Sequence, residues 1–163
     1  MKNTFSKVFI ACTLFVTVIG LSSCGKSSGG GTPSVKGQNA TFTFTITIPA
    51  NAPSTGLLDI VVGGADPANL SNKNLWKVNG VAQSNQSNIV LNTYFPAGKT
   101  TTVTVQSQVP LIDMGVGIGI PGFNPSVVLT YTPEMNGSIV SIDAINNFSV
   151  ATTLNKTFQY NMK

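Results

Sequence analysis

The sequence predicts an all-β domain, a two-sheet β-sandwich of about eight or nine short strands, and three observations support this prediction. Apolar and polar residues alternate at period two in short stretches, which is the spacing of a strand with one buried face. Turn-forming glycine, proline and asparagine recur at roughly the 8 to 12 residue interval expected of sandwiches. Beyond residue 40, helical spacing of apolar residues never continues for more than a turn.

The first 23 residues have the three parts of a signal peptide. Lys2 and Lys7 make the start positive, and an apolar run follows over residues 8–21 (VFIACTLFVTVIGL). Export machinery recognises such a start, an apolar middle of about 7 to 15 residues and an exit of small residues. Spanning a bilayer takes roughly 20 apolar residues, so this run is too short to remain as a transmembrane helix.

The exit of this segment, Leu21-Ser22-Ser23-Cys24, resembles the lipobox of bacterial lipoproteins. The resemblance implies that the thiol of Cys24 is lipidated, that a peptidase cuts before it, and that fatty chains such as palmitate hold the protein on a membrane. The alternative is an ordinary secretory signal cut near Ser23. That cut would leave Cys24 as a lone thiol, because Cys12 departs with the signal peptide, and a lone thiol is unusual in a small exported domain.

Residues 24–39 (CGKSSGGGTPSVKGQN) are rich in glycine and serine and predict a flexible tether with a typical span of about 20 to 25 Å. Gly25 stands where many inner-membrane lipoproteins carry aspartate, which favours the outer membrane of a Gram-negative bacterium. Residues 26–31 lack the acidic cluster of some surface-export signals, so we expect a domain that faces the periplasm.

The sandwich is expected to fill residues 40–163 and to begin with its clearest strand, where phenylalanine and isoleucine alternate with threonine over residues 41–48. A second strand is expected over residues 57–62, closed by Gly63-Gly64. Asn79-Gly80 is the signature of a two-residue hairpin turn, and Asn136-Gly137 is a second such turn. The other expected strands are residues 75–78, 81–83, 88–94, 100–109, 114–120, 127–132, 137–144, 148–151 and 157–160.

Trp76 and residues 94–105 (YFPAGKTTTVTV) resemble immunoglobulin-like bacterial domains, in which a Pro-x-Gly turn leads into such a strand. The resemblance implies an immunoglobulin-like sandwich and carries no functional residue with it. The cysteine pair that joins the two sheets of antibody domains is absent from this sequence.

Composition excludes several classes of function. Without Lys2 and Lys7 the chain keeps seven lysines against five acids, a net charge near +2, and it contains no arginine, so we expect no nucleic-acid partner. The absence of histidine excludes Ser-His-Asp catalysis and His-ligated metal sites. The acids are Asp59, Asp66, Asp113, Glu134 and Asp143. Because they are scattered, we expect no metal, no cofactor and no catalysis; a hydrolase would need two of them within about 10 Å at a cleft.

Two features suggest binding, and each has a plainer structural explanation. Trp76 and Tyr94 could form a stacking platform for a sugar ring, although a single tryptophan on a strand is more often part of the core. Residues 114–120 alternate valine and isoleucine with glycine, which predicts either a flat face for strand addition by a partner, or a bulge or tight sheet contact. A face for strand addition would gain an apolar loop from the residues at the ends of that stretch, which are Leu111-Ile112 and Pro121-Gly122-Phe123.

These observations predict a lipid-anchored, immunoglobulin-like domain that binds or scaffolds another component of the cell envelope, a protein or a glycan, without catalysing a reaction. A carbohydrate-binding module is the alternative, and a carboxylate-dependent hydrolase is a further one.

Overall fold

The computed structural model describes residues 36–52, 58–120, 127–150 and 153–161. The signal peptide, Cys24, most of the tether and the segment Pro121-Gly122-Phe123 lie outside the described residues. Within the described ranges, no helix is long and apolar enough to cross a membrane.

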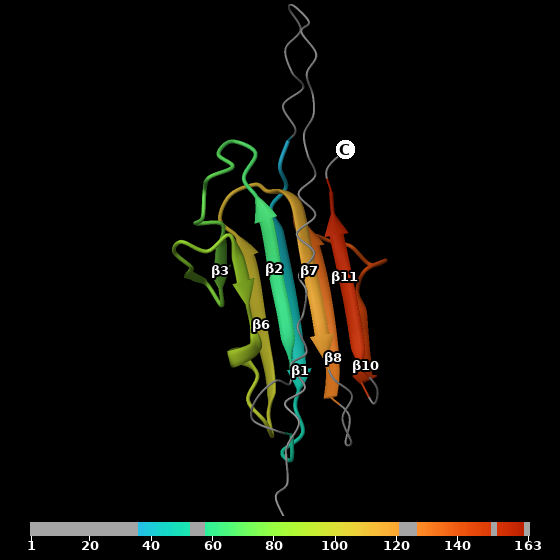
Figure 1. The fold of residues 1–163 in the computed structure, drawn as a ribbon. Helices are drawn as coiled ribbons and strands as arrows, with labels where there is room; N and C mark the ends of the chain where they lie inside the picture. The colour runs from blue at the N-terminus through green and yellow to red at the C-terminus, as the bar shows by residue number, and fades with distance from the viewer. Residues whose placement is uncertain (1–35, 53–57, 121–126, 151–152, 162–163) are drawn as a thin grey trace, which may run out of the picture. The chain divides into compact units, whose positions relative to one another are not determined.

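Two antiparallel sheets pack face to face and confirm the predicted all-β sandwich (Figure 1). The larger sheet has the strand order β10-β8-β1-β6-β3-β4, with β9 paired to β8, and the smaller has the order β11-β7-β2-β5. The strands are β1 (Ala40–Thr47), β2 (Asp59–Ala65), β3 (Trp76–Val78), β4 (Val81–Ala82), β5 (Asn88–Val90), β6 (Thr100–Ser107), β7 (Ile112–Ile120), β8 (Val127–Met135), β9 (Ser138–Ile139), β10 (Ile145–Val150) and β11 (Leu154–Tyr160).

Both predicted asparagine-glycine turns are confirmed. Asn79 and Gly80 adopt φ values of 49° and 80° between β3 and β4, and Asn136 and Gly137 adopt 51° and 78° between β8 and β9. Left-handed backbone at both central positions is what a type I′ hairpin turn requires, and asparagine and glycine tolerate it best.

Several predicted strand limits are wrong, and three of them are informative. The strand expected over residues 88–94 ends at Val90, and the 3₁₀ turn η1 (Asn92–Tyr94) follows. The strand expected over residues 137–144 breaks after Ile139 into a turn, where Asp143 N donates to Val140 O at 3.2 Å. Gly63-Gly64 do not close β2, which continues to Ala65 and stays paired with β7, with Gly63 opposite Gly115 and Ala65 opposite Ile112.

The core lies between the sheets and is built by the inward residues of each strand. Phe42, Phe44 and Ile46 on β1 are fully buried, as the alternation with threonine predicts. Phe44 stacks on Tyr131 of β8 with ring centroids 5.0 Å apart, and Tyr131 packs on Phe158 of β11 at 5.2 Å. Since β8 and β11 belong to different sheets, this aromatic group joins the two layers.

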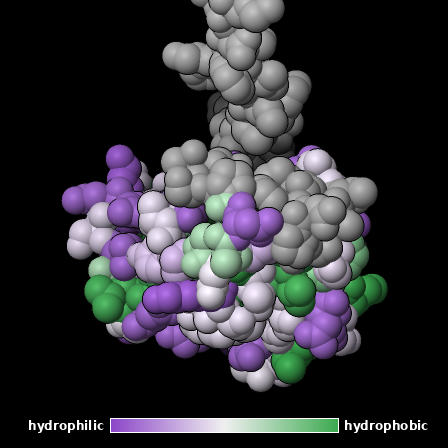
Figure 2. Space-filling model, turned by 90° about the horizontal axis from the view of Figure 1, so that it is seen from below, coloured by the Kyte–Doolittle hydropathy of each residue, from purple (hydrophilic) through white to green (hydrophobic). Residues whose placement is uncertain are grey.

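The outward residues of the larger sheet are mostly threonine. Thr45 on β1 lies opposite Thr102 on β6 and Thr130 on β8. The Thr45 and Thr102 hydroxyls are 2.9 Å apart, and those of Thr47 and Thr100 are 2.7 Å apart, so neighbouring strands satisfy one another's hydroxyls. Seen from below, the described surface is a mosaic of hydrophilic and hydrophobic residues (Figure 2).

Candidate functional site: a glycine-floored sheet face

The candidate site is the outer face of the smaller sheet. On β7, Met114, Val116, Ile118 and Ile120 are buried in the core, so the alternating glycines face outward. We call the outward side of this sheet the glycine face. Its residues are Gly115, Gly117 and Gly119 on β7, Asp59, Val61 and Gly63 on β2, Asn88 and Val90 on β5, and Asn155, Thr157 and Gln159 on β11.

Strand register arranges these residues in three rows across the sheet. One end row runs Gln159, Gly115, Gly63, Asn88. The middle row runs Thr157, Gly117, Val61, Val90. The other end row runs Asn155, Gly119, Asp59. Polar side chains therefore border both sides of the glycine strand, and the middle row is the least polar.

The three β7 glycines differ in the space above them. A side chain at Gly117 would meet no described atom within 4 Å of its Cβ. A Cβ at Gly115 would lie 3.3 Å from the Gln159 amide nitrogen, and one at Gly119 would lie 3.5 Å from the Asn155 amide oxygen. The amides of β11 thus lean over the two end glycines and leave the centre open.

The bordering side chains set what this face can bind. Asn88, Asn155 and Gln159 each offer an amide donor and acceptor, and all three are exposed. Asp59 is the one charged residue among those that make up the face, and Lys156 alternates to the opposite side of β11. Val90, 49% exposed, contributes apolar surface to the middle row. The face can therefore form hydrogen bonds with a neutral polar ligand but has no cation for an anionic one.

Strand addition at the glycine strand, predicted from the alternation, is wrong. β7 is hydrogen-bonded to β2 along one edge and to β11 along the other, so neither edge is free to pair with a partner strand. Leu111, predicted to lie in an exposed apolar loop, is fully buried, and its backbone exchanges two hydrogen bonds with Gln38 at 2.8 and 2.9 Å. A partner could therefore contact β7 only on its outer face.

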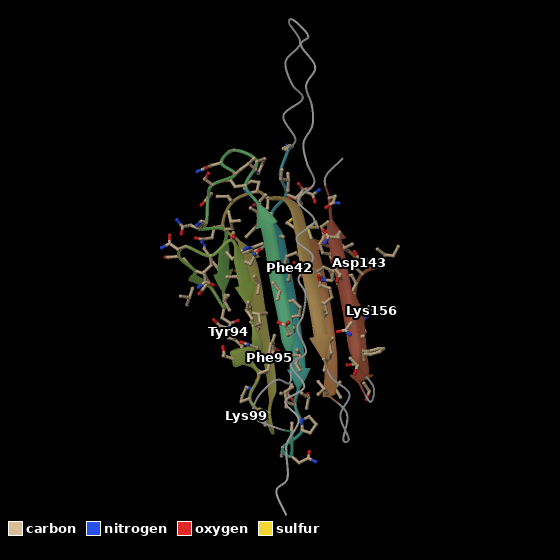
Figure 3. All side chains as sticks on the ribbon, viewed as in Figure 1. Phe42, Tyr94, Phe95, Lys99, Asp143 and Lys156 are labelled. Atoms are coloured by element: carbon tan, nitrogen blue, oxygen red, sulfur yellow. The ribbon has the colours of Figure 1, made fainter. Side chains whose placement is uncertain are left out.

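Trp76 and Tyr94 do not form the predicted stacking platform. Trp76 is fully buried, its Nε1 donates to the carbonyl of Ser87 at 2.9 Å, and its ring lies 6.0 Å from that of Phe42. Tyr94 lies in η1, partly buried against the core, beside β6 (Figure 3). Trp76 is a core residue because its indole fills the space beside Gly64 and has its hydrogen bond satisfied inside the fold.

Asp59 has no second acid beside it among the residues of the glycine face. Asp59 lies opposite Gly119, and Asp113 lies six residues further back along β7, a separation of about 20 Å at 3.4 Å per residue. Asp66 is used within its own loop: it accepts from Ala68 N at 2.8 Å and from the Asn72 amide at 2.9 Å. Glu134 and Asp143 belong to β8 and to the turn before β10. Among the described residues, no three acids or cysteines group as metal ligands.

The hydrogen bonds around Asp66 favour its charged form. The Asn72 amide, followed by the backbone N–H of Ala68, lowers the pKa of this carboxyl from its ordinary value, and burial opposes that shift. Asp66 therefore holds the loop after β2 in shape, because aspartate side chains commonly accept hydrogen bonds from the backbone of a turn.

Sequence reasoning identified the glycine strand but missed Asp59, Asn88, Asn155 and Gln159 as its neighbours. Alternate positions along a strand face opposite sides of the sheet, so the sequence shows which residues of each strand share a face. It does not give the strand order, and these residues come from strands that are far apart in the sequence.

The sequence matches no protein-family model, and no curated protein matches it. Among solved structures, the chain is similar to a crystal structure of a domain of unknown function, DUF4425, from Bacteroides vulgatus. The TM-score is 0.47 and the identity 11%, over 77% of this chain and 94% of that one. It is also similar to an NMR structure of the calcium-bound form of a protein from Parabacteroides distasonis. The TM-score is again 0.47, with 14% identity over 83% of this chain and 99% of that one.

Proposed function

We propose that this chain is a bacterial lipoprotein, acylated on Cys24, whose β-sandwich is a non-enzymatic module that binds or scaffolds another component of the cell envelope through the glycine face. The observation that carries the binding role is the open centre at Gly117, bordered on both sides by exposed hydrogen-bonding side chains. Glycine weakens a strand interior, so three alternating glycines on a central strand favour a close approach from outside.

The lipid anchor is supported by the spacing Leu21-Ser22-Ser23-Cys24. Two or more acyl chains on one cysteine suffice for stable attachment to a bilayer. Gly25 favours delivery to the outer membrane. The dispersal of the five acids supports a role without catalysis, because no pair shares a cleft on the glycine face.

Mass spectrometry and membrane fractionation test the anchor. The wild-type chain should carry the added mass of acyl chains and sediment with membranes, whereas Cys24→Ser should carry none and should lose its membrane association. Cys12→Ser is the matched control, because this thiol lies inside the signal peptide, and it should behave as wild type. An unlipidated wild type would remove the anchor from the proposal.

Capture from detergent-solubilised envelopes tests the binding face. A leucine at Gly117 would occupy the open centre, where its Cβ meets no described atom within 4 Å, so Gly117→Leu should reduce recovery of the bound component at least about tenfold, a change of about 1.4 kcal/mol. Thr43→Leu, on the outer face of the larger sheet, is the control and should leave recovery unchanged. Equal recovery with both variants would show that the glycine face does not bind the captured component.

Carbohydrate binding is the second candidate function, and the glycine face now supports it in place of Trp76. The face measures about 14 Å by 14 Å from strand and row spacings, or roughly 200 Å². A standard protein interface buries about 800 Å² on each partner. This small face has five hydrogen-bonding side chains, of which only Asp59 is charged, and it favours a compact polyhydroxylated ligand over a protein surface.

Neutral oligosaccharides on a glycan array test this second candidate. At least one should bind the wild type, and Gln159→Ala should weaken that binding because it removes an amide beside Gly115. If no glycan binds while envelope capture still depends on Gly117, the partner is a protein and carbohydrate binding is excluded.

A further inference from the structure

The tether enters the sandwich through a set of hydrogen bonds that fix its first described residues. Gln38 exchanges two backbone bonds with Leu111, at 2.9 and 2.8 Å. Asn39 N donates to the Asn136 side-chain oxygen at 3.0 Å, and Asn39 O accepts from Asn136 N at 2.8 Å. Ala40 N donates to the Ser107 hydroxyl at 2.9 Å. The chain is thus held by the segments around β6, β7 and β8 before β1 begins.

β1 itself lies inside the larger sheet and has a hydrogen-bonded neighbour along each edge. Its register with β6 runs from Thr41 opposite Gln106 to Thr47 opposite Thr100, and its register with β8 covers its whole length, from Ala40 to Thr47. Inward residues of β1, including Phe42 and Phe44, are fully buried. Drawing β1 out from its N-terminal end would therefore shift two ladders and the core together.

We propose that β1 is a force-bearing clamp through which tension on the N-terminal tether enters the fold. This inference rests on the proposed function, in which the tether leads to a membrane anchor and the glycine face holds a load. Bonds in a ladder lie perpendicular to its strands, so a pull along β1 loads both ladders in shear, with their bonds acting in parallel. A ladder that is peeled from one end breaks its bonds one after another and yields at a lower force.

The C-terminal strand gives an internal comparison. β11 is an edge strand that pairs with β7 alone, over the seven positions from Leu154 to Tyr160. Several of its residues, including Asn155 and Thr157, are exposed. Leu154 is buried, but Phe158 and Tyr160 are only partly buried. A pull on the C-terminus should therefore detach β11 at a lower force than a pull on the tether needs to extract β1.

Single-molecule force spectroscopy on the full, unlipidated chain tests the clamp. One handle is attached at Gly117→Cys, where the structure leaves open space, and the other at Cys24, with Cys12→Ser to keep the attachment unique. The comparison variant carries Cys12→Ser and Cys24→Ser, and its second handle is at Lys163→Cys. Forced unfolding reports the unfolding rate under load, and the Cys24 geometry should rupture at about twice the force of the Lys163 geometry or more.

Two further variants separate the outcomes. Asn136→Ala with Ser107→Ala removes two side-chain bonds to the entering chain and should lower the rupture force only in the Cys24 geometry. Val61→Cys, on β2 in the same row as Gly117, replaces the first handle if Gly117→Cys does not fold. Equal or lower force in the Cys24 geometry would overturn the clamp. Because the chain is unlipidated, this result stands apart from the Cys24 lipidation test, which judges the anchor alone.

Discussion

Gly64 and Gly117 belong to the same sheet but meet opposite surroundings. A Cβ at Gly64 would lie 3.1 Å from Leu111, 3.2 Å from Met114 and 3.2 Å from Trp76, all core residues. A Cβ at Gly117 would meet no described atom within 4 Å. The sequence shows two glycines in strands and cannot show which of them faces the core, because that depends on a tryptophan twelve residues away from Gly64.

Gly64→Ala should destabilise the protein by about 1 to 3 kcal/mol, since an added methyl in a packed core forces its neighbours to shift. Gly117→Ala is the matched control: it should be neutral or stabilising by up to about 1 kcal/mol, because alanine loses less backbone freedom on folding than glycine does. Urea unfolding followed by Trp76 fluorescence measures both. A Gly64→Ala variant as stable as wild type would show that this contact can relax.

The hydroxyls of Tyr131 and Tyr160 lie 2.8 Å apart and join β8 to β11. Tyr160→Phe leaves the buried Tyr131 hydroxyl without this partner and should cost about 1 to 3 kcal/mol. The double variant with Tyr131→Phe removes both polar groups and should recover part of that loss. A double-mutant cycle by urea unfolding checks this, and strictly additive losses would contradict it.

The same pair predicts how stability changes in alkali. Burial raises the pKa of Tyr160 to about 12 from 10.0, and burial with the Tyr160 hydrogen bond raises the pKa of Tyr131 as well. A raised pKa in the folded state means that the neutral form is favoured there, so its contribution is complete below pH 10 and is lost as the pH rises toward 12. Unfolding free energy should fall over that range, and less steeply in the double phenylalanine variant.

Among the elements, β1 and β2 show what sequence patterns can and cannot give. Strict alternation with threonine over β1 gave its limits almost to the residue, because one period and one buried face explain every position. In β2 the two glycines suggested a stop, yet the strand continues to Ala65, where it is still paired with β7, and Asn88 and Trp76 fill the space above Gly63 and Gly64. Turn signals in the local sequence therefore mispredict the end of a strand where contacts with other elements determine it.

Four of the outer strands, β4, β5, β10 and β11, differ in how they avoid pairing with another chain. β4 and β5 have two and three residues, and β10 carries a register shift between Ile145 and Phe148. β11 is long, but Lys156 takes an inward position in its register, opposite Ile118, while remaining exposed (Figure 3). An inward-pointing charge on an edge strand is a known guard against edge-to-edge association.

Lys156→Val should therefore promote self-association through β11, because it completes an apolar row on a seven-residue edge. Sedimentation velocity across a concentration series should show dimers or larger species that wild type lacks. Lys77→Val, on β3 between two paired strands, removes the same charge without opening an edge and should stay as wild type. If Lys156→Val and Lys77→Val self-associate to the same extent, the cause is the loss of a positive charge and not the edge of β11.

At the scale of the molecule, the sandwich fold followed from the sequence while the proposed binding face did not. Alternation and turn spacing required two sheets, since each strand has one apolar side to bury. The glycine face needs β5, β2, β7 and β11 as neighbours, an order that no local pattern specifies. Local patterns do not specify the burial of Trp76 either, because it depends on Gly64 and Ser87, which lie in other segments.

Because a single aromatic group joins both sheets, the described domain should unfold as one unit. Trp76 is the only tryptophan and reports on the larger sheet, and a fluorophore on Gly117→Cys, with Cys12→Ser and Cys24→Ser, reports on the smaller one. Their urea transitions should coincide. Tyr131→Ala, which empties the contact between β1, β8 and β11, should lower both midpoints together and cost about 3 to 5 kcal/mol, as large aromatic truncations do. Separate midpoints in the parent variant would mean that the sheets are stable independently.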